Sequence, residues 1–455
     1  MTMTIQPLGT AQKAALSNSS RLAIEQSFVR LKRFLSWKRW IGRNNKYRQD
    51  TVDVLKDDAN PRTTSAIDEI ELVQYIAASG PLHCADGWSL VGRALAAHSR
   101  GDSATALHLA YYAELRAAVS VLAVEGIGIF DQPSVSVGST GNCRLIEGYG
   151  THVIAWLALE HWSDSQRAAD LLVDVLSIQG ISCRDWLDSF QKSSVVNRRG
   201  IASKWLKTWG LDLRRFVGDR AARNEASYHP SRISPTPHLE VPECAAFLGE
   251  LWRLHEPSEN SRFDILDRYL LRRILEETYR VVRGRLPKSD PKGFRADIEL
   301  MVADVQPRGQ AAHDWIQFFT RASEPKDPGL IYMAMGMGKQ ENPYNHMQVI
   351  SRAAVLLRIA TGACSRLLES AKFGKRELEF WWQGLGRDLG LWNDLTKPEN
   401  MTDLWADIAI AIKQVNVWVQ TNKATASYAS WQNECASEIS MLGSCERIGL
   451  WGLGL

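Results

Sequence analysis

The sequence of 455 residues has few of the features that mark secreted, membrane or metal-dependent proteins. Its seven cysteines are odd in number, widely spaced and without a CxxC pair, which argues against a disulfide framework or a zinc ribbon. Apolar runs such as residues 353–360 are shorter than the roughly 20 residues of a membrane-spanning helix. Residues 1–20 are polar and have no signal-peptide core. We therefore expect a cytoplasmic protein with no membrane partner.

Several catalytic and cofactor motifs are also missing. The sequence has no HExxH, GxxxxGK[ST] or GxSxG, and no GxGxxG that opens a helix after a strand. Its ten histidines show no metal-ligand spacing, so neither a metal nor a cofactor is expected. The 54 Lys and Arg residues nearly balance the 51 Asp and Glu residues, so any attraction to nucleic acid must come from local clusters.

Hydrophobic periodicity predicts an all-α fold. Helices are expected at 68–76, 86–99, 103–125, 152–162, 165–178, 183–192, 202–224, 243–255, 262–283 and 344–368. The first of them should end at Ser79-Gly80-Pro81. A small β-hairpin formed by Ile127–Phe130 and Val135–Val137 is the one predicted insertion between helices.

Proline-containing linkers divide the sequence into four predicted parts. Residues 1–65 form a basic arm and a linker around Pro61, and residues 66–232 form a helical domain. Residues 233–300 hold the rest of the proline-rich stretch from Pro230 to Pro242, followed by connecting helices. Residues 301–455 form a second, C-terminal helical domain.

The C-terminal domain is expected to be packed around helix 344–368. That helix should lie in the core, with Arg352, Arg358 and Arg366 on its polar side. The domain also holds six tryptophans at 381, 382, 392, 405, 418 and 431, whose helical spacing favours core packing over a base-binding surface.

The basic arm is the densest positive segment. It has eight cations between Arg30 and Arg48, no acid, and four interleaved aromatic residues. One interpretation is that Lys38, Arg39 and Arg43 bind RNA phosphates while the rings stack on bases. The other is that an apolar stripe of Phe34, Trp37 and Ile41 docks on the core, with the cations in solvent. Both interpretations stay open.

One segment combines residue types that suit RNA cleavage. At the end of a basic helix, Arg223-Asn224 is followed by Ser227, Tyr228 and His229. RNA carries its own nucleophile, the 2′-OH, so a histidine near its ordinary pKa can start cleavage without a metal. A guanidinium can hold the charge that gathers on the phosphate.

This segment resembles the signature of the HEPN superfamily of helical ribonucleases. In that signature an Arg is followed by a polar residue, and four to six residues separate the Arg from a His. The resemblance covers residues 66–232, about a third of the chain, and includes the preceding segment His108–Arg116. Three other Arg–His pairs have a permitted spacing, namely Arg93–His98, Arg232–His238 and Arg308–His313. None of them has an Asn directly after the Arg at the end of a basic helix.

The resemblance implies a metal-independent endoribonuclease of a toxin or antiviral-defence type, built on a HEPN-like helical bundle. Arg223, Asn224 and His229 would be catalytic. Arg214, Arg215, Arg220 and Tyr228 would contact the RNA, in addition to the arm residues. One histidine per chain favours a symmetric homodimer, and the C-terminal domain would sense a trigger or a regulatory protein. Two alternatives remain, a non-catalytic helical interaction module and a nucleic-acid-binding subunit that works through the arm.

Overall fold

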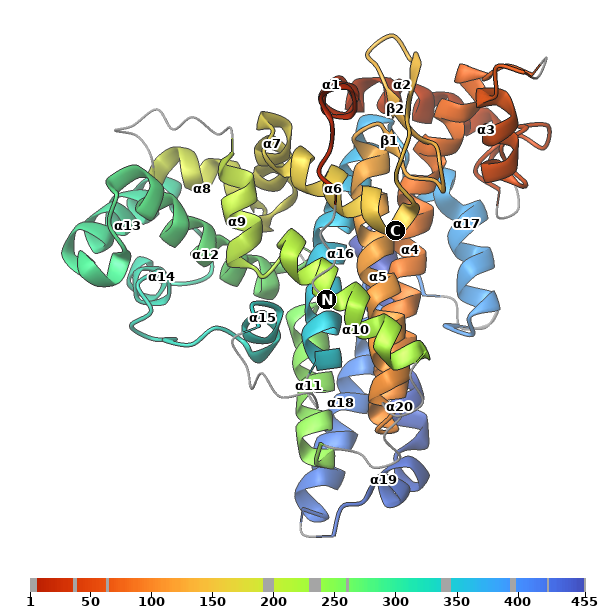
Figure 1. The fold of residues 1–455 in the computed structure, drawn as a ribbon. Coiled ribbons are helices and arrows are strands. Elements are labelled where there is room, and N and C mark those ends of the chain that lie inside the picture. The colour runs from red at the N-terminus through yellow and green to blue at the C-terminus, as the bar shows by residue number, and fades with distance from the viewer. Residues whose placement is uncertain are drawn as a thin grey trace.

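The structure is a computed structural model. It describes residues 6–35, 39–62, 65–190, 200–228, 239–258, 262–336, 345–392, 398–423 and 425–453. This part of the chain is mostly helical and carries two small antiparallel sheets (Figure 1). The helical character and the small β insertion of the predicted fold class are thereby confirmed.

The elements follow one another in three groups. The first third of the chain forms α1 (Thr10–Ser17), α2 (Arg21–Leu31), η1 (Lys32–Phe34), α3 (Thr51–Ala59), α4 (Glu69–Ser99), α5 (Ser103–Val124), β1 (Ile127–Gly128), β2 (Ser134–Val137) and β3 (Cys143–Ile146). The second group is α6 (Thr151–Ser163), α7 (Gln166–Val175), β4 (Ser177–Ile178), β5 (Ile181–Ser182), α8 (Cys183–Phe190), α9 (Ile201–Thr208), α10 (Leu213–Tyr228) and α11 (Val241–Leu254). The third is α12 (Asp264–Arg283), η3 (Pro287–Ser289), α13 (Pro291–Val305), α14 (Ala312–Phe319), α15 (Gly329–Ala334), α16 (Asn345–Ser370), α17 (Lys375–Asp388), η5 (Met401–Asp403), α18 (Leu404–Thr421), α19 (Tyr428–Glu434), α20 (Ala436–Leu442) and α21 (Glu446–Gly452).

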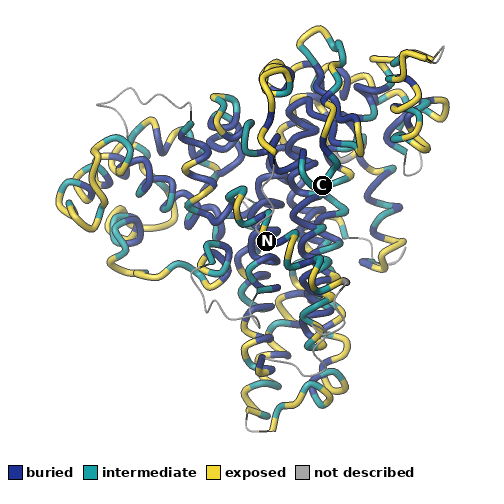
Figure 2. The backbone as a smooth tube through the Cα atoms, viewed as in Figure 1, coloured by how far each residue is buried: buried dark blue, intermediate teal, exposed yellow. Residues whose placement is uncertain are grey.

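The centre of the molecule is formed by α4, α5 and α16, which lie side by side (Figure 1). Burial is concentrated along these three helices, and the other elements surround them (Figure 2). The buried apolar residues form one continuous cluster that runs from Leu8 to Leu453. The predicted boundary at residues 233–300 therefore does not separate two hydrophobic cores.

Two of the central helices are longer apolar segments than the sequence analysis anticipated. By length and composition, α5 and α16 could each cross a membrane, and the short run at 353–360 is only part of α16. In this fold their apolar windows are 78% and 94% buried. Their apolar faces are thus covered by the rest of the protein.

Helix α4 does not end at Ser79-Gly80-Pro81, as predicted, but continues through Pro81 to Ser99. Pro81 has no N–H to donate to the preceding turn, a loss that ends most helices. Here the Ser120 hydroxyl of α5 donates to the Gly80 carbonyl at 2.8 Å, and a Cβ at Gly80 would lie 3.2 Å from Val124. Close packing of α5 against this turn keeps α4 continuous.

The helix predicted at 202–224 is instead two helices, α9 and α10, separated at Gly210. Gly210 has a φ of 84°, and a Cβ there would lie 1.9 Å from the Ala334 carbonyl oxygen. Only glycine fits this conformation and this close approach. The turn allows α10 to run in a different direction from α9.

The small β insertion is present and larger than predicted. Strands β1 and β2 pair as an antiparallel hairpin, and β3 adds to it with Val135 opposite Leu145. The segment 50–65, predicted as a linker, contains helix α3. Its Leu55 is buried, and its Asp58 accepts a hydrogen bond from Tyr47 at 2.5 Å.

The basic arm lies against the core through its aromatic residues. Trp40 is 2% exposed, and its ring centroid lies 5.7 Å from that of Phe28, 5.4 Å from Phe380 and 5.1 Å from Trp381. Tyr47 is also buried, and Phe34 packs against the same cluster. Trp37 and Lys38 lie outside the described residues. The docking interpretation is thereby favoured, whereas RNA contact by Lys38, Arg39 and Arg43 stays a prediction.

The expectation of buried tryptophans in the C-terminal region is confirmed for Trp381, Trp382 and Trp431. The remaining three, Trp392, Trp405 and Trp418, are half-buried and pack on the core. The prediction for the arginines of α16 is wrong for two of the three. Arg352 and Arg358 are buried, because each meets carboxylates inside the core, and Arg366 alone lies on a partly exposed face.

The docked arm yields a stability prediction. Replacing Trp40 with Ala should lower the free energy of unfolding by about 3–5 kcal/mol, because a large ring is removed from a closely packed aromatic cluster. Replacing the exposed Arg43 with Ala should change it by less than about 0.5 kcal/mol. Both values can be measured by urea denaturation. Equal effects of the two substitutions would show that the arm does not dock in solution.

Candidate catalytic site

The structure places Arg223 in the interior. It lies in the last third of α10, and its side chain is buried, with the residue 6% exposed. The guanidinium carbon lies 5.2 Å from the ring centroid of Tyr111 and 5.3 Å from that of Tyr112. Its Nε is buried and has no hydrogen-bond partner within the described residues. Cation–π attraction to two aromatic faces offsets part of the desolvation cost of a buried guanidinium.

Two histidines lie next to these tyrosines and the end of α10. The His152 Nδ1 is 3.0 Å from the Tyr111 hydroxyl, and the His152 ring centroid is 5.7 Å from that of Tyr112. The His108 Nδ1 is 2.7 Å from the Ser227 hydroxyl, one turn beyond Arg223 on α10. These six residues, namely His108, Tyr111, Tyr112, His152, Arg223 and Ser227, are called the Arg223 cluster below.

The charge of Arg223 affects the titration of its neighbours. Burial and the Arg223 charge lower the pKa of His108 below its ordinary value of 6.5. Burial and the same charge, with a further contribution from Arg220, also lower the pKa of His152. Burial raises the pKa of Tyr111 to about 12. At neutral pH both imidazoles are therefore uncharged and able to accept a proton.

Helical spacing explains why these side chains meet. His108, Tyr111 and Tyr112 stand at i, i+3 and i+4 of α5, so they share one face, and Arg223 and Ser227 do the same on α10. His152 belongs to the first turn of α6. The cluster is thus assembled from three helices that pack on one another.

A buried ion network fixes α10 against α5. The Arg352 Nη2 on α16 lies 2.6 Å from an Asp219 carboxylate oxygen of α10, and its Nε lies 3.3 Å from one of Glu114 on α5. Asp219 precedes Arg223 by four residues, and Glu114 lies one turn or less beyond the two tyrosines. Burial, with a contribution from the neighbouring Asp219 charge, raises the pKa of Glu114. Arg352 therefore fixes the position of α10 relative to α5, the two helices that supply most of the Arg223 cluster.

The other predicted site residues are distributed along α10. Asn224 is half-buried beside Arg223, and Arg220 is close enough to lower the pKa of His152. Arg214 and Arg215 lie about 13 Å away along the helix axis, towards its first turn. His229 and the side chain of Tyr228 lie outside the described residues. The structure thus brings Arg220, Arg223 and Asn224 together and separates Arg214 and Arg215 from them.

The sequence analysis did not assign a role to His108, Tyr111, Tyr112 or His152. A weak signal was present for three of them, because a His and two Tyr share one face of a predicted helix. His152 carried no such signal, and a structural role was the natural interpretation. Its position opposite Tyr111 depends on how α6 packs against α5, which spacing in the sequence does not reveal.

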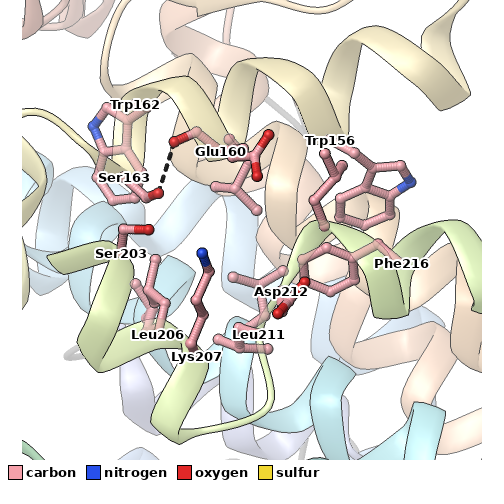
Figure 3. Close-up of a pocket in the computed structure, with 14 residues that line it drawn as sticks. Trp156, Glu160, Trp162, Ser163, Ser203, Leu206, Lys207, Leu211, Asp212 and Phe216 are labelled. Carbon is pink, nitrogen blue, oxygen red and sulfur yellow. Dashed lines mark hydrogen bonds between the residues drawn. The ribbon is translucent and has the colours of Figure 1, made fainter. Parts of the chain in front are cut away.

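One cavity at α10 is too small for a ligand, and no residue of the Arg223 cluster lines it. It lies between α6, α9 and α10 and has a volume of about 20 Å³, room for about one water molecule. Figure 3 shows the rings of Trp156 and Phe216 side by side at its edge, and they stack with centroids 4.2 Å apart. The Ser163 hydroxyl donates to the Glu160 carbonyl at 2.7 Å at the opposite edge. The cavity is a small packing defect where α10 lies against α6 and α9.

Within the described ranges, no group of three or more His, Cys, Asp or Glu side chains is placed to hold a metal ion. Comparisons of the chain with protein families, with curated proteins and with solved structures find no match.

The ion network can be tested through stability. Replacing Arg352 with Ala leaves Glu114 and Asp219 buried without their cation, which should cost about 3–5 kcal/mol of unfolding free energy. Arg366 lies on the same helix and pairs with Glu369 at 3.7 Å on a partly exposed face, so Arg366→Ala should cost less than about 1 kcal/mol. Chemical denaturation measures both. An effect of similar size in the two variants would show that the ion network does not stabilise the packing of α10.

Proposed function

We propose that this protein is a metal-independent endoribonuclease whose catalytic centre is the Arg223 cluster. One observation carries the proposal, namely a buried guanidinium over two tyrosine rings, whose charge acts on two nearby imidazoles that are neutral at physiological pH. The Arg223-Asn224 and His229 motif, with its likeness to HEPN ribonucleases, supports the same chemistry. A phosphate that enters beside Arg223 would meet a fixed positive charge and a proton acceptor together.

We assign the following roles. His108 accepts the proton of the ribose 2′-OH, and the 2′ oxygen forms a bond to phosphorus. Arg223 and Asn224 hold the non-bridging oxygens as negative charge gathers on them. The bond from phosphorus to the 5′ oxygen breaks, and His229 in its protonated form gives that oxygen a proton. The products are a 2′,3′-cyclic phosphate and a free 5′-OH.

His108 suits the role of proton acceptor better than His152. Both rings are half-buried, but the His108 ring is oriented by the Ser227 hydroxyl on the same helix as Arg223. His152 is oriented by Tyr111, whose raised pKa keeps its hydroxyl protonated at pH 7. His152 would therefore position Tyr111 beneath the guanidinium. Arg220 adds positive charge on the same side of α10.

The biological setting implied by the motif belongs to this proposal. A toxin or antiviral-defence role would require the nuclease to be silent until triggered, and the C-terminal helices could receive a regulatory protein. A homodimer would bring a second copy of His229 towards the site. The structure supplies His108 and His152 within one chain, so chemistry by a single chain is also compatible with the geometry.

A second function is favoured by the burial of Arg223. A guanidinium that is 6% exposed and held over two tyrosines can serve packing alone, as in a helical interaction module. In that case RNA would not be cleaved, and loss of Arg223 would lower stability. The following experiments separate the two functions.

The first functional prediction concerns the products. The purified protein should cleave RNA in excess EDTA and leave 2′,3′-cyclic phosphate ends, because the 2′-OH is the nucleophile. DNA of the same sequence lacks this group and should stay intact. The ends can be identified by mass spectrometry. Loss of cleavage on chelation, restored by Mg²⁺, would contradict the proposal.

The second concerns the residues. Arg223→Ala, His229→Ala and His108→Ala should each reduce cleavage by about 10²–10⁴-fold, the range expected for lost acid–base or charge stabilisation. Arg93→Ala and Arg308→Ala are matched controls, because both arginines are exposed and head an Arg–His pair of similar spacing. Cleavage and melting temperature are measured together. If Arg223→Ala destabilises the fold and no variant changes cleavage, the interaction module is the better description.

The third concerns pH. The neutral imidazole of His108 is the active base, and its pKa lies below 6.5. Cleavage should therefore be retained as the pH falls to 6.5 and decline only at lower pH, as His108 becomes protonated. A rate profile between pH 4.5 and 8 tests this. A loss of cleavage on acidification with its midpoint above pH 6.5 would exclude His108 as the proton acceptor.

A further inference from the structure

A second cleft, unrelated to the Arg223 cluster, lies among α12, α13, α15 and the loop 320–328. Its volume is about 1100 Å³, and its walls are mostly apolar. Leu286 and Tyr332 face it while remaining 43% and 44% exposed, and Pro287, Pro291 and Pro325 complete the apolar lining. Clefts of this size are typical of small-molecule sites, although this one is lined by nine charged side chains, more than such sites ordinarily have. The elements that form it belong to the lobe at the left of Figure 1.

The cleft is positively charged. Its lining includes six cationic and three acidic side chains, namely Arg273, Arg280, Lys288, Arg295, Arg321 and Lys326 against Glu276, Glu277 and Asp327. An excess of cations at the wall of an apolar cleft attracts anions, because the low-dielectric wall strengthens their field. The whole chain has a formal net charge of only +3, so the excess is a local property.

The acidic residues of the cleft are already bound to arginines. Asp327 accepts hydrogen bonds from Arg272 at 2.6 Å and from Arg321 at 3.1 Å. Glu276 accepts two from Arg321, at 2.5 and 3.1 Å, and Glu277 pairs with Arg280. These pairs also fix the walls, since Arg272 is fully buried and bonds the carbonyls of Glu324 and Lys326.

Two lysines are left to meet a ligand. Lys288 of η3 and Lys326 of the loop line the cleft and form no ion pair within the described part of the chain. Tyr332 offers an exposed aromatic ring, and Leu286 an exposed apolar side chain. Lysine ammonium groups bind phosphate as point charges, and an aromatic ring stacks on a base.

We propose that this cleft binds a nucleotide, with its phosphates at Lys288 and Lys326 and its base against Tyr332 and Leu286. A ligand of this class has both the anionic group and the flat apolar body that the lining requires. The inference does not depend on the proposed ribonuclease activity, because no residue of the Arg223 cluster lines the cleft. It would give the chain a small-molecule site in addition to its proposed RNA site.

The test is calorimetric titration of the full chain with ATP, adenosine and inorganic tripolyphosphate. ATP should bind saturably, adenosine at least about tenfold more weakly, since each contact with a charged group is worth about 1.5–3 kcal/mol. Lys288→Ala and Lys326→Ala should each weaken ATP binding about tenfold or more on the same basis. Tyr332→Ala should weaken ATP binding and leave tripolyphosphate binding unchanged. Lys413→Ala, an exposed lysine on α18, is the matched control.

Several outcomes would overturn the proposal. These are no saturable binding of ATP, equal binding of adenosine, or ATP binding that is insensitive to all three cleft variants. If single-stranded RNA displaced ATP, and this displacement required Lys288 and Lys326, the cleft would instead be part of an RNA-binding surface. A change of melting temperature measured for each variant separates lost binding from lost folding. Because binding is read directly, failure of RNA cleavage has no bearing on the result.

Discussion

A buried guanidinium imposes a condition that several helices have to satisfy at once. Arg352 is 2% exposed, so its charge has to be met by carboxylates within the core. Glu114 comes from α5 and Asp219 from α10, while the Ala334 carbonyl of α15 accepts from the same group at 3.3 Å. Six residues further along α16, Arg358 repeats the arrangement with Asp267 of α12 and the Val175 carbonyl of α7. Helices α5, α7, α10, α12 and α15 are thus joined to α16 by directional bonds.

Most of the helices could be predicted from the spacing of apolar residues, and the errors occur where tertiary contacts override local preference. Pro81 ought to end a helix, yet α4 continues to Ser99 where α5 packs against this turn and Ser120 donates to the Gly80 carbonyl. A single glycine such as Gly210 is tolerated inside a helix. Here it forms a turn, and the Ala334 carbonyl oxygen occupies the place that a Cβ would take. Arg352 and Arg358 look like a polar stripe because their acidic partners are 133 and 91 residues away in sequence. Spacing within a helix carries no information about such partners.

The candidate site was predictable in the same limited way. Arg223 and Asn224 could be selected because they lie near the end of a basic helix, and α10 does end at Tyr228. His108 and His152 could not, since their relation to Arg223 arises only when α5, α6 and α10 pack together. The burial of Arg223 was also unexpected, because basic residues of a predicted surface helix are ordinarily exposed. In this fold the tyrosines of α5 cover its guanidinium.

The position of α16 between distant segments has a consequence for synthesis in the cell. Helices α4 and α5 are complete at residue 124, but the helix that covers them ends at residue 370. At about 5–20 residues per second, the ribosome needs roughly 10–50 s to make the intervening chain. During that time the surface of the α4–α5 pair that packs on α16 is uncovered, and Trp40 still lacks Phe373, Phe380 and Trp381. The nascent chain therefore exposes apolar surface for a long period before its central helix is made.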